Sequence, residues 1–63
     1  MFVLYDRTIY NGEERGYFDK HHYPHWTDFD HSYGYDDYEE AKEDAEIWNR
    51  GPEGYNLEVI EVE

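Results

Sequence analysis

The N-terminal third of the chain has the pattern of a β-hairpin. Residues 2–10 are rich in aromatic and β-branched side chains, which favour the pleated surface of a strand. Asn11-Gly12 follows, and this dipeptide is typical of a type I′ turn, in which both central residues need a positive φ. We expect a second strand over residues 13–19. A two-residue turn would pair Tyr10 with Glu13, Thr8 with Arg15 and Tyr5 with Phe18.

A helix is predicted over residues 37–49, where apolar side chains recur at helical spacing. The stripe that they would bury consists of Tyr38, Ala41, Ala45 and Trp48. Asp36 and Glu39 have the spacing of a capping box, with Asp36 in the place of the usual Ser or Thr. Gly51-Pro52 would end the helix. Residues 55–62 then have the pattern of a last strand.

Residues 19–35 show neither helical nor strand periodicity and hold all four histidines. We interpret them as one long loop, and such loops in small domains are usually functional or mobile. The predicted fold class is therefore α+β: a three-stranded antiparallel sheet in the order β-β-α-β, with one helix packed on one face. All 63 residues form a single domain, in which the last strand lies beside the first.

The charge is strongly negative and unevenly distributed. Seventeen acids stand against five lysines and arginines, for a net charge of −12, and residues 28–63 hold thirteen of the acids and only two of the bases. Such a field repels nucleic acid and anionic lipid, and it attracts basic surfaces. The thirteen aromatic residues (eight Tyr, three Phe and two Trp) argue against a disordered acidic tail. No cysteine, membrane span or signal peptide is visible, so we expect a cytoplasmic protein.

The predicted helix carries the strongest functional signal. Its acids are almost unrelieved by lysine, although like charges at i, i+4 weaken a helix. Carboxylates spaced along a helix resemble a run of phosphates, and with the acids just before it they are our candidates for partner binding: Asp36, Asp37, Glu39, Glu40, Glu43, Asp44 and Glu46. A charge run that serves only solubility is the alternative.

Aromatic residues of the predicted loop are the second candidate group. Tyr and Trp anchor many protein interfaces, and the chain has more tyrosines than a core of this size can hold. The expected anchors are Tyr23, Trp26, Phe29, Tyr33 and Tyr35. Rings that fold back over an undersized core are the alternative.

Metal binding and catalysis have less support. The histidines and nearby aspartates offer ligands for a divalent ion, but no known zinc pattern is matched, and we expect no metal and no other cofactor. The single serine lacks a recognisable base or oxyanion device, and there is no glycine-rich phosphate loop. We therefore expect a protein that is not an enzyme.

The C-terminal half of the sequence resembles a known class of small proteins. Residues 35–48 (Tyr35-Asp36-Asp37-Tyr38-Glu39-Glu40-Ala41 through Ala45-Glu46-Ile47-Trp48) and residues 54–59 resemble small bacteriophage host-takeover proteins, among them inhibitors of host RNA polymerase. The resemblance implies binding to a bacterial nucleic-acid enzyme through an acidic helix, in the host cytoplasm. The loop at 19–35 and the acidic C-terminal end (Glu58, Glu61 and Glu63) depart from that pattern.

The function expected from all of this is that of a phage-type inhibitor. Its acidic, DNA-mimicking charge would bind the basic, nucleic-acid-binding surface of a host or defence protein, for example RNA polymerase or a nuclease. The chain itself would bind neither nucleic acid nor membrane, and it would be a monomer or a homodimer. Two alternatives remain: a self-associating interaction module and a metal-binding regulator built on the histidine loop.

Overall fold

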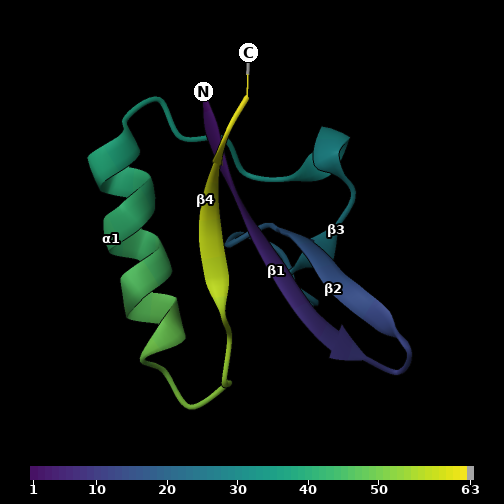
Figure 1. The fold of residues 1–63 in the computed structure, drawn as a ribbon. Coiled ribbons are helices and arrows are strands. Elements are labelled where there is room, and N and C mark those ends of the chain that lie inside the picture. Colours follow the sequence, from purple (N-terminus) through teal and green to yellow (C-terminus); the bar gives the residue numbers. More distant parts are fainter. Residues whose placement is uncertain (63) are drawn as a thin grey trace.

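The computed structural model describes residues 1–62. Its elements are β1 (Phe2–Tyr10), β2 (Glu13–Phe18), β3 (Trp26–Thr27), the 3-10 helix η1 (Phe29–His31), α1 (Tyr38–Asn49) and β4 (Leu57–Glu61). The strands form one antiparallel sheet in the order β3-β2-β1-β4, and α1 lies alongside β4 and β1 (Figure 1). The predicted α+β class is confirmed, and the sheet has four strands where the sequence predicts three.

The hairpin turn is confirmed, but the register beyond it is not the predicted one. Asn11 and Gly12 have φ of 54° and 84°, and Tyr10 pairs with Glu13. Further along, Asp6 pairs with Gly16 and Tyr5 pairs with Tyr17, because β1 contains one extra residue between Asp6 and Ile9. The predicted Thr8–Arg15 and Tyr5–Phe18 pairs are therefore wrong. A one-residue shift turns side chains to the other face of a strand, and here Phe18 enters the core.

The bulge is stabilised by a buried carboxylate. The Asp6 side chain is 0% exposed and accepts hydrogen bonds from the Thr8 backbone N–H (2.7 Å) and the Asn56 N–H (2.9 Å). Arg15 Nη1 lies 3.4 Å from the same carboxylate. Asp6 thus joins β1, β2 and the segment that leads into β4.

The segment 19–35 contains more regular structure than the sequence pattern indicates. β3 pairs with β2 through Tyr17–Thr27 and Phe18–Trp26, and η1 follows directly. The turn between these strands is closed by a hydrogen bond from the Asp19 N–H to the His25 carbonyl (2.7 Å). The expectation of one irregular loop is therefore wrong in this part, since a two-residue strand is too short to show any periodicity.

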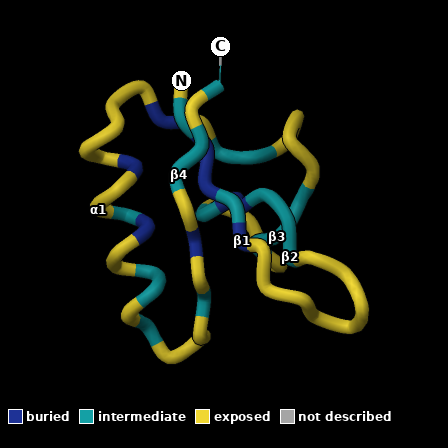
Figure 2. Tube along the Cα trace, viewed as in Figure 1, coloured by how far each residue is buried: buried dark blue, intermediate teal, exposed yellow. Residues whose placement is uncertain are grey.

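α1 begins one residue later than predicted and is capped by Asp37, whose side chain accepts from the Glu39 N–H at 3.1 Å. Asp36, the predicted cap, is exposed. Ala41 and Ala45 are buried, on the side of the helix that faces the sheet (Figure 2). Tyr38 is 46% exposed, so its predicted place in the core is wrong; it packs edge-on against Phe2 at the margin.

The core is small, and half-buried aromatic rings pack around its buried residues. Its main cluster of buried residues consists of Leu4, Phe18, Tyr35, Ala41, Ala45 and Leu57, and Val3 is buried as well. Phe18 lies at the centre, and its ring centroid is 5.1–5.9 Å from those of His25, Trp26, Trp48 and Tyr55. The chain therefore fills its core with rings, which bury more area per residue than aliphatic side chains do.

Candidate functional site: the outward face of α1

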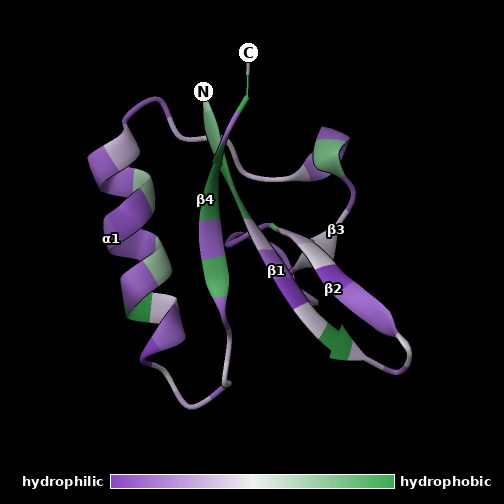
Figure 3. Ribbon diagram, in the orientation of Figure 1, coloured by the Kyte–Doolittle hydropathy of each residue, from purple (hydrophilic) through white to green (hydrophobic). Residues whose placement is uncertain are grey.

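The carboxylates of the predicted binding helix are mostly free. Glu39, Glu40, Glu43 and Glu46 are exposed, as are Asp36 and Asp37 immediately before them. Among residues 1–62, none of these six side chains takes part in an ion pair. Hydrophilic residues cover most of α1, while the hydrophobic residues gather in β1 and β4 (Figure 3). We call Glu39, Glu40, Glu43 and Glu46 the acidic face of α1.

The acidic face has a fixed position relative to the sheet. The Asn49 side chain donates to the Leu57 carbonyl (3.0 Å) and accepts from the Leu57 N–H (2.7 Å), which joins the end of α1 to β4. Lys20 reaches from the turn after β2 to the middle of the helix. The carboxylates therefore stand on a rigid element, as a patterned charge surface requires.

Asp44 does not belong to this face, contrary to the sequence prediction. Its half-buried carboxylate accepts hydrogen bonds from Lys20 Nζ and from the Tyr35 hydroxyl, each at 2.8 Å. Burial alone would raise the pKa of Asp44, but the hydrogen bonds from Lys20 and Tyr35 outweigh it and lower the pKa. Asp44 therefore neutralises Lys20 in a half-buried ion pair and has a structural role.

The five predicted aromatic anchors do not form one surface. Tyr35 is only 2% exposed, so its expected role as an exposed anchor is wrong, and half-buried Tyr33 packs against it at 4.7 Å between ring centroids. Phe29 is 41% exposed and lies against Tyr17. Tyr23 and Trp26 line one cleft, apart from the other three.

The same cleft contains residues that the sequence prediction missed, chiefly Tyr10, Glu53 and Tyr55. These residues come from the hairpin turn and from the segment after α1. The Asn-Gly turn signal places Tyr10 at the end of a strand, but nothing in the sequence pattern brings these separate segments together.

Two of the four histidine rings contact an aspartate carboxylate. Nδ1 of His22 lies 2.6 Å from Asp19, and Nδ1 of His31 lies 2.7 Å from Asp28. The hydrogen bond to Asp28 raises the pKa of His31. Within the part of the chain that the structure describes, no three His, Asp or Glu side chains are placed to hold a metal ion together.

Comparison with protein-family models, curated proteins and solved structures finds no match for this chain. The resemblance to host-takeover proteins accordingly stays a prediction. In residues 1–62, no helix has both the length and the apolar character needed to cross a bilayer.

The carboxylates predict how stability depends on pH. Burial would raise the pKa of Asp6, but the hydrogen bonds from Thr8 and Asn56 hold it below the ordinary aspartate value of 3.8, and Asp44 is lowered likewise. A carboxylate whose pKa is lower in the folded state than in the unfolded state stabilises the fold at any pH above its unfolded-state pKa. This stabilisation is lost as the pH falls through the folded-state pKa. Between pH 8 and about 5 the opposite trend is expected, because partial protonation relieves self-repulsion in a chain of net charge −12.

Urea unfolding between pH 8 and 3, followed by tryptophan fluorescence, should therefore show a stability maximum near about pH 5. In about 0.5 M NaCl the rise from pH 8 to 5 should flatten, because salt screens exposed charges. The loss below pH 4 should persist, since salt screens a buried carboxylate such as Asp6 much less. A stability that climbs steadily down to pH 3 would contradict the roles given to Asp6 and Asp44.

Proposed function

We propose that this protein is a phage-type inhibitor that binds the basic, nucleic-acid-binding surface of a host or defence enzyme through the acidic face of α1. RNA polymerase and nucleases are examples of such enzymes. The observation that carries the proposal is that four exposed glutamates without ion-pair partners in residues 1–62 stand on one anchored helix. Without a partner, this arrangement costs the helix some stability through repulsion.

The spacing of these charges supports mimicry of nucleic acid. Residues four apart on a helix are about 6 Å apart along the axis, which separates Glu39 from Glu43. Duplex DNA carries one charge per roughly 1.7 Å of its axis, spread over two strands. The negative charge along α1 is sparser than that of a duplex, but it forms a line that a groove lined with lysine and arginine can follow, and Asp36 and Asp37 extend it past the N-terminus of the helix.

Self-association has less support. β4 is an edge strand of the sheet, and such edges can pair with a second copy. It carries two exposed acids, Glu58 and Glu61, and charged residues on an edge oppose this kind of pairing. Two copies of a chain with net charge −12 also repel each other.

Reversal of Glu43 and Glu46 to lysine should weaken binding to the partner at least about a hundredfold, because like charges across an interface cost several kcal/mol. Both residues lie beyond the first turn of α1, so the favourable position of Glu39 and Glu40 near the helix N-terminus is retained. The measurement is capture of DNA- and RNA-handling proteins from bacterial lysate, followed by the dissociation constant for the purified captured protein. Duplex DNA should compete with the inhibitor.

The matched control reverses Asp30 and Glu61, two exposed acids outside α1, and changes the net charge by the same amount. Its affinity should stay within about threefold of wild type, apart from a slower association rate. Equal losses in the two variants would mean that only total charge matters, and the acidic face of α1 would lose its special role.

A further inference from the structure

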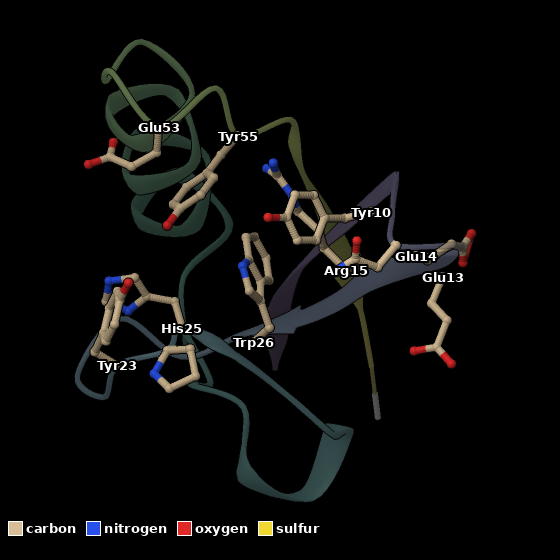
Figure 4. A pocket seen from close by; sticks show the side chains of 11 residues that line it. Tyr10, Glu13, Glu14, Arg15, Tyr23, His25, Trp26, Glu53 and Tyr55 are labelled. Carbon is tan, nitrogen blue, oxygen red and sulfur yellow. The ribbon is translucent and has the colours of Figure 1, made fainter.

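A cleft of about 600 Å³ lies between the β1–β2 turn, the turn before β3 and the segment after α1. Figure 4 shows Trp26 between Tyr10 on one side and Tyr23 with His25 on the other, and Tyr55 across from Tyr10. Its volume is within the range of pockets that enclose small-molecule-sized groups. The acidic face of α1 does not line it.

Aromatic rings form the walls of the cleft, and two of these rings are exposed to solvent. Tyr23 is 89% exposed and Tyr10 is 64% exposed. Trp26 and Tyr55, in contrast, are half-buried and packed edge-to-face at 4.9 Å, and both lie against Phe18 in the core. The cleft therefore has a fixed floor and two exposed rings that a ligand can cover.

The rings at this cleft already hold one guanidinium group. Arg15 lies 5.4–5.8 Å from the ring centroids of Tyr10, Trp26 and Tyr55. Cations over aromatic faces are attracted by the ring quadrupole. The buried Asp6 carboxylate, 3.4 Å from Arg15 Nη1, compensates the positive charge.

The remaining charge of the cleft is negative. Glu13, Glu14 and Glu53 line it, and none of the three is in an ion pair within residues 1–62. Glu14 accepts a hydrogen bond from the Tyr5 hydroxyl at 2.8 Å. Aromatic faces next to uncompensated carboxylates favour a cation as the occupant.

We infer that this cleft receives an arginine or lysine side chain of a partner protein. The aliphatic part of that side chain would lie between Tyr10 and Tyr23, while its charge meets Glu53, which lies beside Tyr55 (Figure 4). The inference rests on the proposed function only for the basic character of the partner, because it assigns a second contact away from the acidic face of α1. The partner would then be recognised at two places: by extended charge complementarity along the helix and by one inserted basic side chain.

A tripeptide probe tests the cleft without any knowledge of the natural partner. Acetyl-Gly-Arg-Gly-amide, titrated into the ¹⁵N-labelled protein, should shift the Trp26 indole N–H signal in a saturable way. The citrulline analogue, which has the same shape without the charge, should bind at least about tenfold more weakly. Equal binding of the two peptides, or no shift of the Trp26 signal with either, would overturn the inference.

Variants locate the binding and separate it from the proposed function. Tyr23→Ala and Glu53→Gln change exposed side chains, so the fold should be retained, and each should weaken binding of the arginine peptide several-fold. Glu43→Gln on α1 should leave it unchanged. If acetyl-Gly-Glu-Gly-amide bound more tightly than the arginine peptide, Arg15 would be the anchor of an anion site and the inference would be wrong. If the arginine peptide binds as expected but the α1 variants keep full affinity for the partner, the proposed function is refuted and the inference about the cleft still stands.

Discussion

Asp6→Ala is expected to destabilise the fold by about 3–5 kcal/mol, because it removes the carboxylate that compensates Arg15 and satisfies two backbone N–H groups. Arg15 has a side-chain exposure of only 17%, so water replaces the lost partner poorly. A domain of this size has little stability in reserve. We therefore expect the variant to be largely unfolded at 25 °C, as measured by circular dichroism and by urea unfolding.

Asp30→Ala is the matched control, since Asp30 is exposed and forms no ion pair within the described residues. Its free energy of unfolding should stay within about 0.5 kcal/mol of wild type. Asp6→Asn should not restore stability, because an amide presents one oxygen and an NH₂ group to a site built from donors. An Asp6→Ala variant as stable as the Asp30→Ala control would show that the bulge between Asp6 and Ile9 does not depend on the carboxylate.

Phe18→Ala is expected to cost about 3–5 kcal/mol, the usual range for a fully buried phenylalanine. Phe18 is 1% exposed and contacts four rings from three parts of the chain. With the ring removed, Trp26 and Tyr55 lose the surface against which they pack. Urea unfolding should show the loss, and the near-ultraviolet circular dichroism of the two tryptophans should collapse with it.

Phe29→Ala makes the same chemical change on the surface. Phe29 is 41% exposed and has one aromatic neighbour, Tyr17, at 5.5 Å. We expect a loss of about 1 kcal/mol or less. Comparable losses at positions 18 and 29 would contradict the central place of Phe18 in the core.

Local signals in the sequence predicted much of the fold. Asn11-Gly12 specified the hairpin turn by its φ preference alone, and the spacing of Ala41, Ala45 and Trp48 specified which side of α1 meets the sheet. The bulge was not predictable, because a carboxylate in a strand is normally taken to face solvent. Asp6 is instead buried, and its carboxylate accepts hydrogen bonds from donors of residues 8, 15 and 56.

The candidate site was predictable where exposure followed from helical position and unpredictable where a tertiary contact intervened. Glu40 and Asp44 are one helical turn apart and look alike in sequence, yet Lys20 and Tyr35 donate hydrogen bonds only to Asp44. Tyr23 and Tyr35 likewise belong to one aromatic-rich segment. Only Tyr35 is buried, because its backbone is hydrogen-bonded to that of Phe2 in β1. The cleft combines segments whose proximity depends on the whole fold.

The pairing of Lys20 with Asp44 also affects covalent labelling. The chain has two lysines, and the hydrogen bond from Asp44 raises the pKa of Lys20, which keeps its amine protonated and weakly nucleophilic. Lys42 is exposed on α1, next in sequence to Glu43. Amine-reactive dyes and cross-linkers will therefore react preferentially at Lys42 between the two lysines. A dye there would mask the acidic face of α1, whereas a short cross-linker at the same amine would join the protein covalently to whatever molecule rests on that helix.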